Sequence, residues 1–307
     1  MKKFAPLFII VAAILWAVDG IVLTPKLFSL PVPLVVFLNH VLAFILMLPF
    51  FIKEFKEVKK LKKGDWGAFI WIAIFGGAIG TMAIVKALFY VNFINLSVVI
   101  LLQKFQPIFA IVLAWLILKE HLPKKFFMWA LLAVVGGYFV TFGINPPILN
   151  TGDKTVVAAL FSLLAAFAFG SATVFGKRAL KNTNYRIGTY LRFGLTSVIM
   201  FLILLTTGDL SQMSMVSSFQ WLIFFIIVLT TGGTAIFIYY YGLKFVTASV
   251  STICELAFPL SAILLEYFIR GNALTWAQWL GAILLGYSIY MVTKLKEGRD
   301  EVVISNK

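Results

Sequence analysis

Among the charged side chains within long apolar stretches of this sequence, four could do chemistry. Lys104 and Glu255 fall near the middle of their stretches, whereas Asp19 and Lys86 lie closer to one end. A charge surrounded by apolar groups is costly unless it is paired or solvated, so each of these groups should face a cavity or a partner. Lys104 could contact an anion or carboxylate, and Glu255 could contact an amine or carry a proton. A structural ion pair between the two is an equally open interpretation.

Other ionisable groups offer less specific chemistry. Asp19 and Lys86 could form a second pair, for which a structural or gating role is favoured over a substrate contact, and the Asp19 carboxylate could carry a proton. His40, beside Asn39, is of the one side-chain type that titrates unperturbed near neutral pH, although a lone histidine more often bonds a neighbouring carbonyl. We expect the Arg192 guanidinium to reach from its apolar stretch toward water.

Neutral polar and aromatic side chains accompany these charges. They could line the same site, although tyrosines near a membrane interface and buried tryptophans also serve in packing. The members of this group are Gln103, Gln106, Ser249, Ser251, Thr252, Trp16, Tyr239, Tyr240 and Tyr241.

The sequence lacks the patterns of common enzymes. It contains no H-E-x-x-H, no G-x-S-x-G and no phosphate-binding P-loop, and its histidines do not cluster with its single cysteine, Cys254. One cysteine also excludes an internal disulfide framework. We therefore expect neither an enzyme nor a protein that holds a metal or another cofactor.

Composition indicates a membrane protein. Hydrophobic residues make up 62% of the 307 residues, charged residues only 12%, and the mean hydropathy is +1.01. Soluble domains are roughly one quarter charged. The formal charge of +14 comes from Lys and Arg in short breaks between apolar runs, which indicates membrane topology and not nucleic-acid binding.

Ten apolar stretches approach the length of about 20 residues that a helix needs to cross a bilayer. The sequence therefore predicts an all-α polytopic membrane protein with ten transmembrane helices. The predicted spans are 6–24, 32–52, 66–90, 95–118, 124–143, 154–176, 185–207, 218–242, 247–269 and 274–295.

The distribution of basic residues predicts the orientation of these helices. Lys and Arg near helix ends are retained in the cytoplasm, and most of the 26 basic residues fall on one side if both termini are cytoplasmic. Five helices then precede the central linker and five follow it, so the two halves are inverted. The predicted parts are an N-terminal five-helix repeat at 1–143, an external linker at 144–153, a C-terminal five-helix repeat at 154–295 and a cytoplasmic tail at 296–307.

The two halves also share sequence. Residues 92–141 align with 244–293 without a gap, and the matches include Ser97 with Ser249 and Pro107 with Pro259. Each proline follows a charged candidate by about one turn. A proline frees a backbone carbonyl and can kink a helix, so Pro107 and Pro259 are predicted hinges or gates.

At the level of motifs the chain resembles the drug/metabolite transporter superfamily, specifically its EamA-type members with ten spans. The resemblance rests on Ala12-Ala13-x-x-Trp16, on Tyr-Gly-Leu-Lys-Phe-Val-Thr-Ala-Ser at 241–249, and on Pro107 followed by Leu-Lys-Glu-His-Leu at 118–122. It covers nearly the whole chain. The resemblance implies alternating access around a cavity between the halves near the membrane midplane, a mechanism that inverted repeats permit.

These observations predict a secondary active transporter, and the resemblance favours export. Both signs of charge near midplane suggest small polar metabolites such as amino acids, and proton coupling is possible. A channel or facilitative pore is the alternative, although neither selectivity-filter loops nor rings of like charge are present. We expect contacts with membrane lipid but not nucleic acid, a monomer or homodimer, and a place in the plasma (inner) membrane of a prokaryote.

Overall fold

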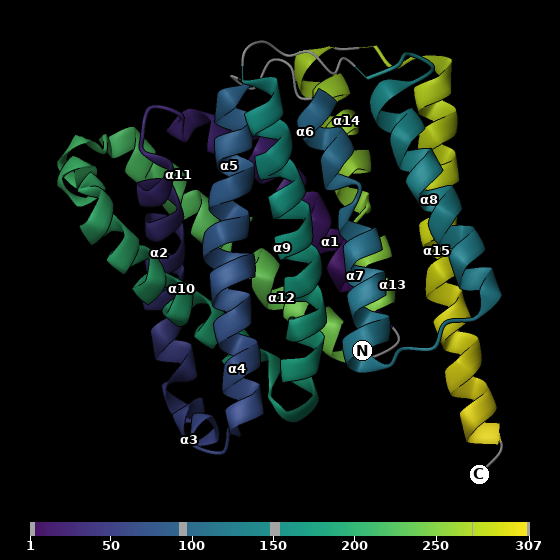
Figure 1. Cartoon of the computed structure of the whole chain (residues 1–307), viewed down its shortest axis with the longest axis horizontal. Helices are drawn as coiled ribbons and strands as arrows, with labels where there is room; N and C mark the ends of the chain where they lie inside the picture. The colour runs from purple at the N-terminus through teal and green to yellow at the C-terminus, as the bar shows by residue number, and fades with distance from the viewer. Residues whose placement is uncertain (1–3, 92–96, 148–153, 272, 306–307) are drawn as a thin grey trace.

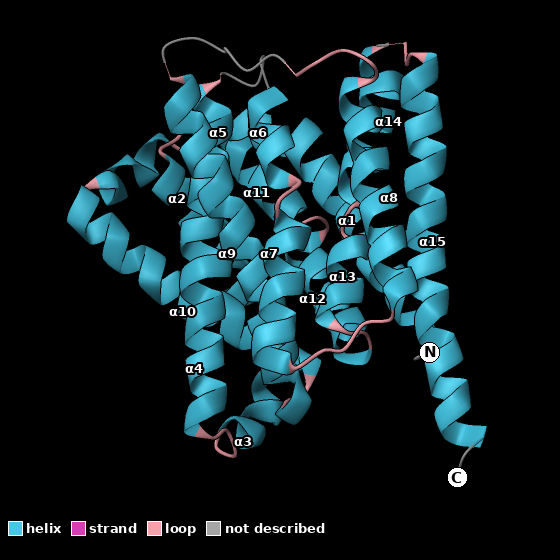
Figure 2. Ribbon diagram, turned by 45° about the vertical axis from the view of Figure 1, so that its right-hand side comes forward, coloured by secondary structure: helices cyan, strands magenta, loops and turns pink. Residues whose placement is uncertain are grey.

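The computed structural model describes residues 4–91, 97–147, 154–271 and 273–305, and every regular element in these ranges is helical. Helices satisfy their own backbone hydrogen bonds, as long apolar segments require in lipid. Long helices stand side by side in a bundle (Figures 1 and 2). Both termini lie in the same half of the bundle as α3 in this view (Figure 1).

The first half contains the elements up to α8. They are α1 (Ala5–Val18), η2 (Asp19–Leu23), η3 (Thr24–Leu27), α2 (Val32–Phe51), η4 (Ile52–Glu54), α3 (Phe55–Val58), α4 (Lys63–Trp71), η5 (Ile72–Ile79), α5 (Gly80–Tyr90), α6 (Ser97–Gln103), α7 (Gln106–Leu113), η6 (Ala114–Leu118) and α8 (Lys124–Phe142). η2, η5 and η6 are π-helical turns within longer helices.

The regular elements described in the second half are also all helices. Its elements are α9 (Thr155–Asn182), α10 (Tyr185–Thr207), η7 (Asp209–Met215), α11 (Ser218–Leu229), α12 (Gly233–Phe245), α13 (Ala248–Cys254), α14 (Ala257–Arg270) and α15 (Trp276–Ser305). Most of the predicted linker, 148–153, and residues 306–307 of the predicted tail lie outside the described residues.

Nine helical segments of the described chain are long and apolar enough to cross a membrane. They are Ala5–Leu27, Val32–Phe50, Lys63–Tyr90, Leu101–Leu118, Lys124–Phe142, Thr155–Asn182, Tyr185–Thr207, Ser218–Phe245 and Ala248–Ile269. These correspond to the first nine predicted spans. The tenth prediction falls on α15, which is outside this set. α15 contains Gln278, Ser288 and two tyrosines, which lower its hydropathy, and it continues as helix to Ser305 into the predicted tail.

Three predicted spans are interrupted helices. α6 ends at Gln103 before α7, α13 ends at Cys254 before α14, and α11 ends at Leu229 before α12. The first two interruptions lie next to Pro107 and Pro259, which cannot donate a backbone hydrogen bond. Lys104 and Glu255 stand in these two breaks. Motion about the breaks stays a prediction.

Two glycines bring α8 and α15 together along their length (Figures 1 and 2). A Cβ added at Gly136 would lie 2.7 Å from the Leu285 nitrogen, and one at Gly281 would lie 2.6 Å from the Val140 nitrogen. Their lack of a side chain therefore permits a contact between two backbones. These glycines serve packing inside the bundle. Gly286 of α15, by contrast, faces open space.

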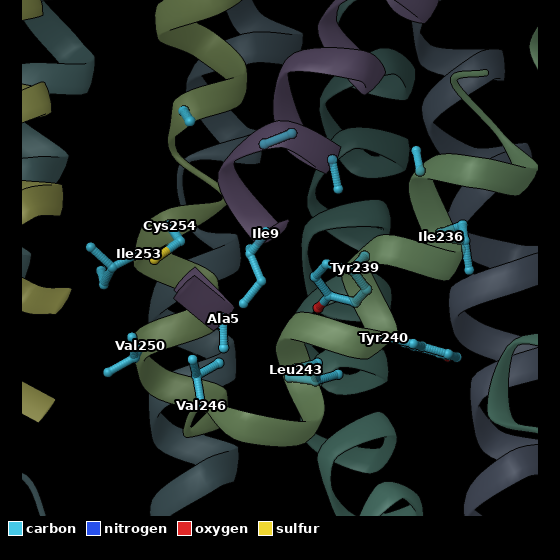
Figure 3. Packing of buried hydrophobic residues seen from close by; sticks show 14 of the residues in the cluster. Ala5, Ile9, Ile236, Tyr239, Tyr240, Leu243, Val246, Val250, Ile253 and Cys254 are labelled. Carbon is cyan, nitrogen blue, oxygen red and sulfur yellow. The ribbon is translucent and has the colours of Figure 1, made fainter. Parts of the chain in front are cut away.

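The largest cluster of buried apolar side chains joins α1, α12 and α13. Ala5 and Ile9 of α1, Leu243 of α12 and Ile253 of α13 all belong to this cluster (Figure 3). All four are fully buried. Helices of the two halves are thereby held together around the tyrosines of α12.

Candidate functional site

Glu255 is the centre of a hydrogen-bonded cluster in the break between α13 and α14. Its Oε1 accepts from the Tyr239 hydroxyl at 2.8 Å, the Ser251 hydroxyl at 3.0 Å and, more weakly, the Thr173 hydroxyl at 3.4 Å. Its Oε2 accepts from Nε2 of Gln106 at 2.7 Å. Each carboxylate oxygen has about two acceptor positions, so the donors fill Oε1 and leave one position of Oε2 unused.

The cluster draws on both halves of the chain. Gln106 begins α7, whereas Thr173 comes from α9 and Tyr239 from α12. Trp16 of α1 adds an aromatic wall, since its ring centroid lies 5.2 Å from that of Tyr239. A carboxylate beside two aromatic rings is suited to a flat ligand that also carries hydrogen-bond donors.

Lys104 lies in the other break, between α6 and α7. It is 7% exposed, and among the described residues its ammonium has no hydrogen-bond partner. The neighbouring Gln103 donates from Nε2 to the Ser162 carbonyl at 2.8 Å.

The ion pairs considered from the sequence do not form. Lys104 and Glu255 are not paired with each other among the described residues; the Lys104 ammonium has no partner there, and Glu255 accepts only from neutral groups.

Asp19 and Lys86 also lie apart. Asp19 accepts a hydrogen bond of 3.0 Å from the Thr24 hydroxyl. Lys86 is exposed, with its ammonium 5.9 Å from the centre of the Tyr90 ring. Asp19 is thus held by a neutral neighbour within its own span.

The buried histidine bonds a neighbouring carbonyl. Nδ1 of His40 lies 2.8 Å from the Val36 carbonyl, so Nδ1 carries the proton that it donates there. Its ring packs against Phe193 with 5.6 Å between centroids. The carbonyl of the Asn39 amide is buried without a partner in the described structure.

Arg192 does not reach toward water, contrary to the expectation from its depth. Its side chain points into the bundle and is 9% exposed. Nη2 donates to the Gly76 carbonyl at 3.1 Å, and Nη1 lies 3.5 Å from the Tyr240 hydroxyl. The sequence gives depth along α10 but not the direction of the side chain around it.

Thr173 is the member of the Glu255 cluster that sequence reasoning did not select. Its only signal was a hydroxyl in an apolar stretch, which many packing residues share. Gln106 and Tyr239 appeared among the neutral candidates without a specific role. No group of three or more metal-ligating side chains occurs in the part of the chain that the structure describes.

Two hollows of the bundle lie away from Glu255. One of about 410 Å³ is lined by α2, α10, α11 and α12, and one of about 260 Å³ by the start of α1 and by α15. Neither is lined by Glu255 or by the residues bonded to it. Glu255, Gln106 and Trp16 nevertheless each keep part of their surface accessible.

Comparisons with known proteins agree with this architecture. The EamA-like transporter family matches residues 3–142 and again 156–294, once in each half. The riboflavin transporter ImpX of Fusobacterium nucleatum subsp. nucleatum is 51% identical over 290 residues, which are 94% of this chain and 97% of that protein. An uncharacterised transporter of Synechocystis is 26% identical over 276 residues, 87% of this chain and 78% of that protein.

The fold also has a counterpart among solved structures. One crystal structure superposes with a TM-score of 0.73 over 98% of this chain and 100% of that chain, at 16% sequence identity. At this identity the likeness concerns the fold alone.

Proposed function

Because the chain belongs to the EamA-like transporter family, we propose that it carries riboflavin across the membrane and binds it at Glu255. It is a multi-pass membrane transporter of a small metabolite and not an enzyme. The observation that supports riboflavin is the 51% identity to a riboflavin transporter over nearly the whole of both chains. The bacterial source of that relative supports the plasma membrane of a prokaryote as the location of this protein.

The chemistry of the Glu255 cluster suits this ligand. Riboflavin combines a flat three-ring system with a chain of hydroxyl groups. Trp16 and Tyr239 supply flat apolar surfaces, and Glu255 and Gln106 supply an acceptor and an amide. A ligand hydroxyl can replace Tyr239 or Gln106 as the donor to Glu255, so binding exchanges hydrogen bonds without leaving the carboxylate unsatisfied.

Amino acids, expected from the sequence, are not carried forward as the substrate. That expectation rested on the presence of both charge signs near midplane and on the resemblance, whereas the relative that is 51% identical is a riboflavin transporter. Export was expected from the resemblance alone and stays a prediction. We retain alternating access between the halves as the mechanism, because the family matches the chain once in each half and repeated halves permit it.

Transport in proteoliposomes tests the proposal. We expect riboflavin uptake that saturates and that accelerates when riboflavin is also present inside the vesicles. Amino acids should not compete. Flux that rises linearly with concentration, or ionic conductance, would support a pore. Competition by amino acids with no effect of riboflavin would overturn the proposed substrate.

A further inference from the structure

Arg192 is a buried permanent charge without a counter-ion in the described structure. Its guanidinium does not lose its proton in proteins, so burial cannot be relieved by neutralisation. It is 9% exposed, and no salt bridge within the described residues includes it. Its contacts are a backbone carbonyl and a phenol, and its Nε is buried with no hydrogen-bond partner. An unpaired charge in a transmembrane span points to a ligand.

A structural role for Arg192 accounts for only part of this arrangement. Nη2 braces the π-helical turn η5 through the Gly76 carbonyl, since a π-turn leaves carbonyls outside the regular ladder. One N–H group suffices for that contact. A guanidinium has five N–H donors in a planar fork, so the brace leaves most of them unused.

Two adjacent tyrosines link Arg192 to the Glu255 cluster. The hydroxyl of Tyr239 donates to Glu255, while the guanidinium carbon of Arg192 lies 5.9 Å from the centre of the Tyr240 ring. The two rings leave α12 in different directions (Figure 3), with centroids 5.8 Å apart. An acidic and a basic group therefore lie on either side of one aromatic pair.

We propose that Arg192 recognises the electron-rich edge of the substrate's heterocycle. In riboflavin this edge is ring nitrogen N1 with the adjacent C2 carbonyl, two acceptors side by side that match a planar fork of donors. The ribityl hydroxyls then remain for Glu255. This inference rests on the proposed function and adds a specificity-determining residue to it.

Binding of flavin analogues to the purified transporter tests this assignment. In 1-deazariboflavin a C–H group replaces N1, which removes one acceptor and keeps the shape. The wild type should bind it about tenfold more weakly than riboflavin, equivalent to ~1.4 kcal/mol. This comparison needs no variant, so it does not depend on the folding of a mutant.

An Arg192 variant tests whether Arg192 is the residue that contacts flavin N1. R192K keeps the charge and can still donate to the Gly76 carbonyl, but it loses the fork. We expect R192K to weaken riboflavin binding by about tenfold and 1-deazariboflavin binding by less than about threefold. R178K, the same change at an exposed arginine of α9, is the matched control and should bind both flavins like the wild type. The unfolding midpoint in detergent measures separately whether the hydrogen bond to the Gly76 carbonyl stabilises the protein.

Several outcomes would overturn the assignment. Equal loss of both flavins in R192K, or equal binding of both by the wild type, would make Arg192 a brace only. Much tighter binding of the phosphorylated flavin, lost in R192K, would show that the guanidinium binds phosphate instead. Absence of riboflavin binding to the wild type would reject the proposed function and this inference with it, whereas the other outcomes reject this inference alone.

Discussion

Gln106 donates a hydrogen bond of 2.7 Å from its side-chain amide to Glu255, across the two halves of the chain. Each residue stands at a helix break next to a proline, Gln106 at the start of α7 and Glu255 between α13 and α14. The bond therefore ties together the two places where backbone regularity is lost. Relative movement of the halves at these breaks must break or exchange it.

Removing this amide should weaken ligand binding. In Q106A the Glu255 carboxylate loses a donor, at a cost of ~1 to 3 kcal/mol, and the ligand loses a polar contact. We expect weaker riboflavin binding by about tenfold in a fluorescence titration. The control is Q103A, three residues earlier, which removes a donor to the Ser162 carbonyl only. Equal binding by Q106A and Q103A would contradict a ligand role for Gln106.

A second contact between the halves is predicted to hold the start of α13 against the segment that contains Glu120. The Glu120 carboxylate accepts from the backbone nitrogens of Ala248 and Ser249 at 2.8 and 3.1 Å, and from the Ser249 hydroxyl at 2.6 Å. Such charge-assisted bonds at a helix start are among the strong ones. E120Q should therefore populate opened conformations.

The single cysteine reports this opening. Cys254 ends α13 and is fully buried, so its reaction with a maleimide requires local opening. We expect its labelling rate to rise by about tenfold in E120Q, equivalent to ~1.4 kcal/mol. E57Q changes an exposed glutamate and should label at the wild-type rate. An unchanged rate in E120Q would show that its contact does not restrain α13.

Two glycine-to-alanine substitutions should distinguish the effect of close helix packing on stability from the effect of helix propensity. G136A places a methyl group 2.7 Å from a backbone nitrogen of α15, and overpacking of this kind costs ~1 to 3 kcal/mol. G286A meets open space on the same pair of helices and should be neutral or stabilising by up to ~1 kcal/mol. Thermal unfolding in detergent compares the two. A G136A protein as stable as G286A would refute the close contact of α8 with α15.

Proton coupling is predicted to use Asp19. Its carboxylate accepts from the neutral Thr24 hydroxyl and lies in the π-turn η2, whereas Glu255 is committed to four donors. D19N should retain riboflavin exchange at equal pH and lose the response of uptake to an imposed pH gradient. T24A, which removes the donor and keeps the acid, should still respond. A D19N transporter that follows the gradient like the wild type would remove Asp19 as the carrier.

The sequence predicted the helical class and most helix positions because apolar length decides both. Pro107 and Pro259 also indicated where helices would be interrupted, since the missing N–H group acts locally. The partner of Glu255 was not predictable in this way. Gln106 follows Lys104 by two residues, which is about 200° around a regular helix. Both residues therefore lie at the right depth, and only the rotation of the helix about its axis decides that Gln106 faces Glu255.

Arg192 illustrates the same limit in a different form. Its depth of about 10 Å from a helix end, at 1.5 Å per residue, is compatible with a side chain that reaches water. Only the packing of α10 against η5 and α12 turns it inward. Thr173 could not be selected from the sequence. A threonine hydroxyl in an apolar helix can bond a carbonyl of its own helix as readily as it can bond a residue of a binding site.

Riboflavin counterflow in proteoliposomes with the E255Q transporter tests the central claim most directly. E255Q keeps the shape of the side chain and removes the charge that accepts four hydrogen bonds. E266Q, the same change eleven residues later in α14, is the matched control. The account predicts that E255Q loses counterflow by more than about tenfold while E266Q stays within about twofold of the wild type. Wild-type counterflow in a correctly folded E255Q transporter would contradict it.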